Sequence, residues 1–224
     1  MELSLIKDSV IISVQAMPNE PLYKDDCMKA MMQSVINGGA KTLRVAGVRD
    51  VKIAKSLGVN VIGITKPDKL PDNWKEVVYI TPTTNEVREL LDAGADIIAF
   101  DGTSRERPAN CTLEDIISLI KQNNRLAMAD ISTFEEGILC AKLGADILST
   151  TLSGYTIESE SDSTEPDYDL LFKLVKYTNL PVILEGRIWE PSQVSKAFDL
   201  GAFSVVIGSA VTRPQLITKR FIER

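Results

Sequence analysis

The sequence predicts an α/β protein folded as a single (β/α)8 barrel, a TIM barrel, over residues 1–224. Three observations favour this fold class. A short apolar run preceded by a Gly-Ala turn recurs along the chain, eight apolar runs have the length of strands, and amphipathic helical patterns lie between them. The recurring phrases are GGAKTLRVAG from residue 38, AGADIIAFDG from residue 93, LGADILSTT from residue 143 and LGAFSVVIGSA from residue 200.

Each recurring phrase is typical of a helix that ends at glycine and is followed by a strand. The glycine can adopt the left-handed conformation of a helix C-cap, and the apolar run after it predicts a strand. The four glycines lie 55, 50 and 57 residues apart, too far for one αβ unit; they are Gly39, Gly94, Gly144 and Gly201. A second strand is therefore expected in each interval. These strands are 61–66, 126–131 and 181–186, and 10–15 supplies the first of the eight.

The predicted strands are almost continuously apolar, which indicates parallel strands covered by helices on their outer face. The helical patterns between them include residues 27–37, 84–93, 113–122 and 134–143. An open doubly wound sheet is the alternative, but the chain contains neither G-x-G-x-x-G after a strand nor G-x-x-x-x-G-K-[ST]. The segment VVYITP, 77–82, resembles a ninth strand, and we assign it to an ordered excursion between the third strand and the helix that follows.

Composition excludes several classes of protein. The chain has 224 residues and no histidine. Because its net charge is -6, it is not expected to bind nucleic acid. We expect a cytoplasmic protein without membrane contact, because no apolar run is long enough for a membrane helix and the first residues do not resemble a signal peptide. The three cysteines lack C-x-x-C spacing and are expected to be reduced and packed, without a metal.

In barrels of this class, the chemistry is found at the carboxyl ends of the strands. The predicted strands end in a polar ring that is dense in charge. Three cations and three carboxylates gathered there would be costly without a ligand or mutual pairing. The residues of this ring are Gln15, Arg44, Lys66, Asp101, Asp130, Thr150, Thr151, Glu185, Arg187, Gly208 and Ser209.

Lys66 and Glu185 are the candidate catalytic residues. A lysine at the barrel mouth, near Arg44 and partly desolvated, would have a lowered pKa, as a base or a Schiff-base nucleophile requires. Glu185 is placed at the carboxyl end of the seventh strand. The two side chains would form either an acid and base pair or an inert salt bridge.

The ends of strands 7 and 8 predict a phosphate site. Backbone N–H groups on glycine turns bind phosphate at this place in many barrels. Gly186, Gly208 and Ser209 allow close approach, and Arg187 and Arg213 supply positive charge. The long acidic segment 152–169 follows strand 6, and its Tyr155 could close over a ligand.

Several segments in order resemble the N-acetylmannosamine-6-phosphate 2-epimerase family of bacterial sialic-acid breakdown. They are ISVQAMPNEPLY, TLRVAG, VIGITK, FDGTSRERP, LAMADISTFEEG, TTLSGYT, ILEGRIWEP and VVIGSAVTRPQLIT. The resemblance implies a (β/α)8 phosphosugar enzyme without metal or nucleotide cofactor, and a homodimer. It places the catalytic lysine on Lys66 and the essential glutamate on Glu185. Sugar contacts fall on Gln15, Arg44 and Asp130, and phosphate contacts on Gly186, Arg187, Gly208, Ser209 and Arg213.

Three positions depart from the family pattern. Pro67 follows the lysine where the family has a basic residue before aspartate. Val14 replaces a cysteine, and Ser149 stands where glycine is common.

The implied reaction inverts carbon 2 of N-acetylmannosamine 6-phosphate to give N-acetylglucosamine 6-phosphate. Neutral Lys66 would remove the proton from the open-chain aldehyde, Arg44 would stabilise the enolate, and Glu185 or Lys66 would return a proton to the other face. Two alternatives remain open at this point. One is a Schiff-base phosphosugar aldolase or lyase, and the other is a phosphosugar-binding protein in which Lys66 and Glu185 merely pair.

Overall fold

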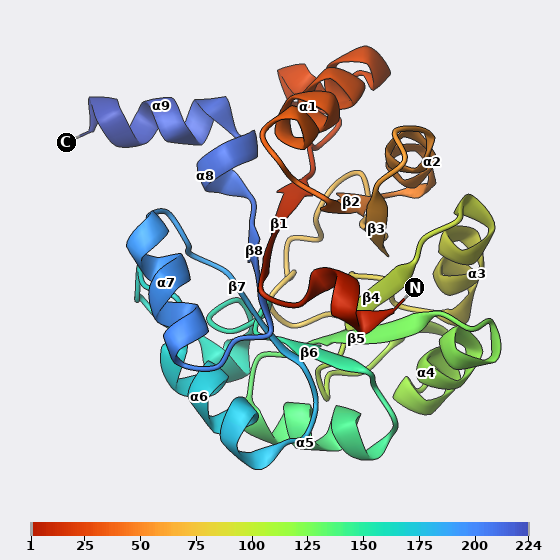
Figure 1. Ribbon diagram of the computed structural model, residues 1–224. Coiled ribbons are helices and arrows are strands. Elements are labelled where there is room, and N and C mark those ends of the chain that lie inside the picture. Colours follow the sequence, from red (N-terminus) through yellow and green to blue (C-terminus); the bar gives the residue numbers. More distant parts are fainter. Residues whose placement is uncertain (1, 224) are drawn as a thin grey trace.

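A computed structural model of the chain describes residues 2–223. Its centre is a closed barrel of eight parallel strands that follow one another in sequence order (Figure 1). This topology confirms the predicted (β/α)8 barrel. The strands are β1 (Ser9–Val14), β2 (Thr42–Ala46), β3 (Asn60–Ile64), β4 (Ile97–Asp101), β5 (Leu126–Asp130), β6 (Ile147–Ser149), β7 (Val182–Glu185) and β8 (Ser204–Ile207).

Helices surround the barrel as an outer layer (Figure 1). The α-helices are α1 (Asp25–Asn37), α2 (Val48–Ser56), α3 (Thr84–Ala93), α4 (Leu113–Gln122), α5 (Phe134–Lys142), α6 (Tyr168–Tyr177), α7 (Pro191–Asp199), α8 (Ser209–Thr212) and α9 (Pro214–Ile222). Four short 3-10 turns accompany them: η1 (Leu3–Ile6), η2 (Pro21–Tyr23), η3 (Pro108–Asn110) and η4 (Ile157–Ser159). The four glycines of the recurring phrases all have positive φ, as predicted: Gly39, Gly94, Gly144 and Gly201.

Alternation along the strands separates two apolar cores. On β3, Ile62 and Ile64 point into the barrel, whereas Val61 packs outward against the helices. Gly63 also faces outward, where an added Cβ would lie 3.0 Å from the Cβ of Ala95, so helix packing leaves no room for a side chain. The strands are therefore apolar on both faces, which is why they read as continuous apolar runs in the sequence.

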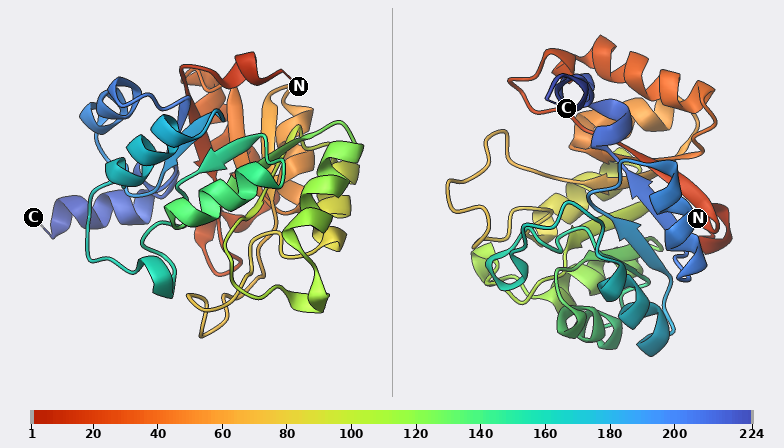
Figure 2. Two further views of the ribbon diagram at one scale, coloured as in Figure 1. Left: turned by 90° about the horizontal axis from the view of Figure 1, so that it is seen from below. Right: turned by 90° about the vertical axis from the view of Figure 1, so that its left-hand side faces the viewer.

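The two ends of the barrel are closed differently. At the amino ends of the strands, η1 brings Ile6 into the interior core, where its side chain is fully buried. The carboxyl ends carry the long connections, and the left view of Figure 2 places the N-terminal segment and the 65–83 connection at opposite ends. Only the carboxyl end is therefore free to form a site.

The segment 77–82 resembles a strand in its apolar pattern but is not one. It does lie in an ordered excursion between β3 and α3, as predicted. Its ties to neighbouring backbone are isolated hydrogen bonds, from Thr81 N to Thr65 O and from Asp101 N to Ile80 O. Its apolar residues are buried because Ile80 extends the interior core at the barrel mouth. Burial against the mouth, rather than strand pairing, thus explains the apolar pattern.

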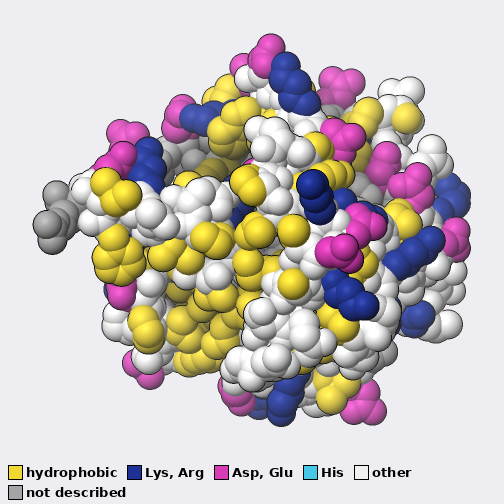
Figure 3. Space-filling model, turned by 90° about the horizontal axis from the view of Figure 1, so that it is seen from above, with side chains coloured by type: hydrophobic (Ala, Val, Ile, Leu, Met, Phe, Trp, Pro, Cys, Tyr) yellow, Lys and Arg dark blue, Asp and Glu magenta, His cyan; other side chains and the backbone are white. Residues whose placement is uncertain are grey.

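The last helix leaves the body of the molecule. In Figure 1, α9 extends outward from the ring of helices, and Phe221 and Ile222 are each 75% exposed. Figure 3 looks onto the side where α1 and α9 lie and shows hydrophobic side chains gathered there. Within residues 2–223, no helix combines the length and apolar character needed to span a bilayer.

Candidate active site

A cavity of about 460 Å³ opens at the carboxyl ends of the strands. It is lined by residues from the ends of β1, β7 and β8 and from the connections after β3 and β6. Nine of the eleven predicted site residues form part of its wall: Gln15, Lys66, Tyr155, Glu185, Gly186, Arg187, Gly208, Ser209 and Arg213. The other two, Arg44 and Asp130, are absent from the wall and lie deeper.

Lys66 lies two residues beyond the end of β3 and is half-buried in the cavity wall. Its Nζ donates a hydrogen bond to Oε1 of Gln15, 2.9 Å away. Burial, together with the positive charge of Arg44, lowers the pKa of Lys66 to about 8. A substantial fraction of this amine is therefore neutral near physiological pH and able to accept a proton.

Arg44 lies beneath the cavity floor and is 1% exposed. It is not at the end of its strand: it pairs in register with Ser13 of β1 and Ile62 of β3, one layer below the mouth. Its guanidinium binds Asp130 through two hydrogen bonds of 3.0 and 2.5 Å. Although burial alone would lower the pKa of Arg44, the negative charges of Asp130 and Glu185 raise it, so the side chain is a fixed cation.

Glu185 ends β7 and connects this buried pair to the cavity. Its Oε2 lies 3.0 Å from NH1 of Arg44 and accepts a hydrogen bond of 3.1 Å from the hydroxyl of Thr151. Burial raises the pKa of Glu185 to about 7, and the nearby charge of Asp130 acts in the same direction while Arg44 opposes it. Lys66 and Glu185 thus have pKa values displaced toward each other, as is common for acid and base groups at active sites.

The predicted phosphate residues gather on one side of the cavity. Gly186 has φ +110°, a conformation strained for other residues. A Cβ added to Gly208 would lie 3.4 Å from the Cβ of Ser13, and Ser209 begins α8 directly after it. Arg213 lines the cavity and pairs with Glu20 at 3.1 Å. This side offers exposed backbone and one cation to an anionic group.

Arg187 is placed differently from the sequence expectation of a charge turned toward phosphate. Its Nε and NH1 donate hydrogen bonds of 2.7 Å to the carbonyl oxygens of Glu165 and Ser153. The guanidinium also lies 5.5 Å from the ring centroid of Tyr155. Arg187 therefore fastens the connection after β6, on which Tyr155 is carried, and only part of its donor set remains for a ligand.

Comparison with known proteins gives the family. The family model described as "Putative N-acetylmannosamine-6-phosphate epimerase" (NanE) matches residues 28–224. This chain belongs to the NanE family. A Clostridium perfringens relative named "Putative N-acetylmannosamine-6-phosphate 2-epimerase" is 46% identical over 223 residues, 99% of this chain and 98% of its own. One from Clostridioides difficile, of the same name, is 44% identical over 99% of this chain and 97% of its own.

A solved NanE structure has the same fold. The N-acetylmannosamine-6-phosphate 2-epimerase from Clostridium perfringens superposes with a TM-score of 0.93 and 46% identity, covering 99% of this chain and 95% of that chain. The 3-hexulose-6-phosphate synthase from Salmonella typhimurium is 17% identical with a TM-score of 0.65, over 91% of this chain and 90% of its own. This second likeness concerns the barrel fold alone.

The three departures from the NanE pattern lie outside the acid and base groups. Pro67 is exposed beside Lys66. Val14 faces outward in the core between barrel and helices. The Ser149 hydroxyl lies 2.8 Å from that of Thr151, so it adds a polar contact close to Glu185.

Sequence reasoning missed part of the cavity wall of this NanE member. Met17, Leu70, Trp74, Tyr79 and Trp189 also line the cavity. Trp74 and Tyr79 come from the excursion after β3, where the only signal was an apolar run that resembled a strand. Among residues 2–223, no group of three or more His, Cys, Asp or Glu side chains is arranged to hold a metal ion.

Proposed function

We propose that this protein epimerises N-acetyl-D-mannosamine 6-phosphate to N-acetyl-D-glucosamine 6-phosphate, with Lys66 and Glu185 as its acid and base groups. The observation that carries this proposal is the pair of displaced pKa values in one cavity, Lys66 near 8 and Glu185 near 7. Membership of the NanE family supports the substrate and the reaction.

The reaction begins with the open-chain aldehyde, because only there is the proton on carbon 2 acidic enough to remove. Neutral Lys66 accepts that proton at Nζ, and the electron pair of the broken C–H bond passes to the carbonyl oxygen as an enolate. Return of a proton to the opposite face of carbon 2 completes the inversion. General acid and base catalysis of this kind is worth about 100 to 10,000-fold in rate.

Glu185 is suited to act as the acid. A pKa of about 7 keeps a fraction of its carboxyl groups protonated at neutral pH, so the group can deliver a proton to carbon 2 or to the ring oxygen during ring opening. Lys66 could instead return its own proton after the carbon 1 to carbon 2 unit rotates. The side of the cavity that holds Gly186, Gly208, Ser209 and Arg213 would bind the phosphate and fix the other end of the substrate.

Arg44 and Asp130 would act through Glu185 rather than by direct contact with the sugar. Both lie below the cavity floor, and Arg44 touches Glu185 at 3.0 Å. A fixed cation at this depth lowers the energy of negative charge that develops above it, including the enolate. Full turnover by a folded Arg44→Ala variant would show that Arg44 does not stabilise the enolate.

The two rival functions are less well supported. A binding protein in which Lys66 and Glu185 merely pair would hold an ion pair between them, yet within residues 2–223 Lys66 makes its hydrogen bond to neutral Gln15 and no salt bridge. A Schiff-base aldolase or lyase would also use Lys66, and reduction with borohydride in the presence of substrate would trap the covalent adduct.

Proton NMR of the purified protein with N-acetylmannosamine 6-phosphate in heavy water tests the proposal. We expect N-acetylglucosamine 6-phosphate to accumulate with deuterium at carbon 2, and we expect a folded Lys66→Ala variant to give neither conversion nor exchange. Conversion without incorporation would argue against an enolate exposed to solvent protons. Absence of both in the folded wild type would overturn the epimerase assignment.

We further propose that the protein is a homodimer in the cytoplasm. The resemblance that suggests a dimer is supported by the exposed apolar side chains of Phe221 and Ile222 on α9 and of Val211 on α8. Figure 3 looks onto the side of the molecule where α9 lies and shows hydrophobic side chains gathered there. Light scattering of the wild type and of a Phe221→Ser/Ile222→Ser variant tests this. A monomeric wild type would contradict it.

A further inference from the structure

Two irregular segments form part of the cavity wall. The 65–83 connection contributes Leu70, Trp74 and Tyr79, and the 150–160 connection contributes Leu152 and Tyr155. Apart from the single turn η4, neither segment belongs to a helix or strand. Their position over the cavity must therefore be set by contacts outside the regular secondary structure.

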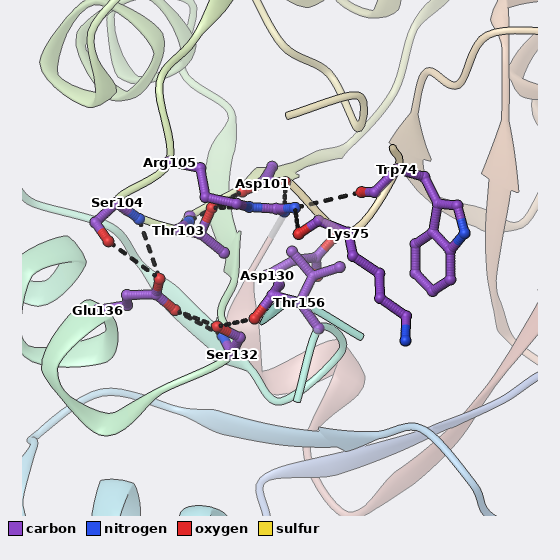
Figure 4. Close-up of polar contacts among 12 residues, drawn as sticks. Trp74, Lys75, Asp101, Thr103, Ser104, Arg105, Asp130, Ser132, Glu136 and Thr156 are labelled. Atoms are coloured by element: carbon purple, nitrogen blue, oxygen red, sulfur yellow. Dashed lines mark hydrogen bonds and ion pairs between the residues drawn. The ribbon is translucent and has the colours of Figure 1, made fainter. Parts of the chain in front are cut away.

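Arg105 fastens the first segment to the barrel. It lies in the connection after β4, and its side chain is 4% exposed. Its NH1 donates a hydrogen bond of 2.9 Å to the carbonyl oxygen of Lys75, while NH2 reaches Oδ2 of Asp101 at 2.6 Å and Nε reaches the hydroxyl of Thr103 at 3.0 Å. Figure 4 shows the guanidinium between Asp101 and the backbone of Trp74 and Lys75.

Asp101 makes this attachment rigid. It is the last residue of β4 and is fully buried. Its Oδ1 accepts hydrogen bonds from the backbone N–H and the hydroxyl of Thr103, at 3.0 and 2.6 Å. Arg105 thus connects an irregular segment to the end of β4, a strand that is paired with β3 on one side and with β5 on the other.

Glu136 performs a similar role for the second segment. It lies in the first turn of α5, accepts from Ser104 N at 3.1 Å, and accepts from the hydroxyl of Ser132 at 2.8 Å. Ser132 in turn accepts a hydrogen bond of 3.1 Å from the hydroxyl of Thr156, which lies next to Tyr155. Figure 4 shows this chain of contacts running from Ser104 to Thr156 beside the Arg105 cluster.

The two segments also meet each other at Lys75. The carbonyl oxygen of Lys75 accepts from Arg105 and also from the backbone N–H of Ile157, at 3.4 Å. The Lys75 ammonium forms a salt bridge with Glu160. Because one carbonyl oxygen is shared, loss of Arg105 would loosen both segments together.

We propose that Arg105 is a positioning residue for substrate binding, which holds the Lys75 carbonyl and thereby orders the wall that carries Trp74, Tyr79 and Tyr155. The proposal rests on the proposed function of the cavity but not on Lys66 or Glu185. If the wall is already ordered, the entropy cost of ordering it is not charged against the free energy of ligand binding. Arg105 should therefore affect KM far more than kcat, because its contacts are with Asp101, Thr103 and the Lys75 carbonyl and it does not line the cavity.

The matched control is Arg107, two residues further along the same connection. Arg107 is as buried as Arg105, but within residues 2–223 its NH1 and NH2 have no hydrogen-bond partner. We expect Arg105→Met to raise KM about 10-fold and to change kcat less than about 2-fold, since it removes binding common to ground and transition states. Arg107→Met should leave KM unchanged.

Limited trypsin digestion gives a readout that does not depend on turnover. Lys69 lies in the exposed part of the 65–83 segment, and release of the segment should speed cleavage after Lys69 into fragments 1–69 and 70–224. We expect Arg105→Met to be cleaved there about 10-fold faster than the wild type, because loss of a charge-assisted hydrogen bond raises the open population by that order. The Arg107→Met protein should be cleaved at the wild-type rate.

A second variant separates positioning from stability. Arg105→Met leaves the Asp101 carboxylate buried without its partner, whereas Asp101→Asn/Arg105→Met removes that charge as well. A raised KM in the double variant with a near-normal melting temperature would support the proposal. A KM that returns to the wild-type value, equal effects in Arg107→Met, or unchanged trypsin cleavage in Arg105→Met would overturn it. Failure of the wild type to turn over would overturn the proposed function instead, and the cleavage result would still decide the role of Arg105.

Discussion

The amine of Lys66 is held 2.9 Å from the amide oxygen of Gln15, so its hydrogen-bond partner is a neutral acceptor rather than a carboxylate. A carboxylate partner would favour the ammonium form and raise the lysine pKa. A neutral amide leaves burial and the charge of Arg44 to dominate, and the pKa falls to about 8. The Gln15 contact thus orients the amine without suppressing its basicity.

Replacement of Lys66 should abolish catalysis without unfolding the protein. Lys66→Ala is expected to lower kcat by at least about 1,000-fold, within the range for loss of a general base. Exposed Lys52 on α2 provides the matched control, and Lys52→Ala should retain full turnover. Circular dichroism would establish that both variants are folded. Retention of more than a tenth of the rate by Lys66→Ala would exclude it as the principal base.

The rate should depend on pH with a maximum between the two displaced pKa values. Lys66 must be neutral, a form whose fraction increases as pH rises through about 8, and Glu185 must be protonated, a form whose fraction decreases as pH rises through about 7. The value of kcat/KM should follow the product of the two fractions. Because the groups interact, the two limbs report on the pair. A bell-shaped profile centred between pH 7 and 8 is expected from initial rates. A profile that rises without a descending limb would show that Glu185 does not act as the acid.

Gln15→Leu should lower the pKa of Lys66 further. The amide oxygen accepts a hydrogen bond that is stronger from an ammonium than from an amine, so its loss destabilises the charged form. The shift should be about 1 pH unit, because a hydrogen bond to a charged group is worth on the order of 1.5 kcal/mol. The limb of the kcat/KM profile assigned to Lys66 would move to lower pH. Movement to higher pH would contradict the role given to this contact.

Glu185→Gln should stabilise the protein above pH 7 while reducing activity. Because the folded-state pKa is about 7, above the ordinary value of 4.5, the stabilising contribution is complete below pH 4.5 and is lost as pH rises through 7. Above pH 7 the wild type buries an ionised carboxylate, which the amide avoids, for a gain of about 1–3 kcal/mol. Urea unfolding at pH 8.5 and at pH 5 measures this gain. A variant less stable at both values would show that the ion pair with Arg44 outweighs burial.

Arg213→Met should weaken recognition of the phosphate. We expect kcat/KM for the phosphorylated sugar to fall about 10 to 100-fold, the value of one or two charge-assisted hydrogen bonds. The reaction with unphosphorylated N-acetylmannosamine should change little, so the ratio of the two substrates is the quantity to measure. Gln215→Met is the control, since Gln215 shares the contact with Glu20 but does not line the cavity. Equal losses with both sugars would place Arg213 outside the phosphate site.

The sequence allowed the barrel, its strand order and nine residues of the cavity wall to be predicted, because glycine turns and apolar runs are local signals. Depth within the barrel is not local. Arg44 was read as the end of a strand, yet β2 continues to Ala46 and register with Ile62 places Arg44 below the floor. The depth of a strand residue below the barrel mouth depends on the stagger between neighbouring strands. The sequence of one strand does not determine that stagger.

The excursion after β3 was beyond sequence reasoning for a different reason. Its apolar residues are buried against the barrel mouth, and its position depends on contacts between distant segments, such as Arg105 with the Lys75 carbonyl. Arg187 is a related case: its charge predicted an anion contact, but two of its donors serve loop carbonyls. Donor assignment depends on which backbone oxygens lie nearby, and this emerges only from the folded chain.

The burial of Ile6 at the amino end of the barrel has an isotopic consequence. Since the interior core closes that end, water can exchange with the Lys66 ammonium only through the mouth that the substrate itself fills. A proton taken from carbon 2 should then sometimes return to the same molecule before it exchanges with solvent. Early product formed in heavy water should therefore retain part of its original hydrogen at carbon 2.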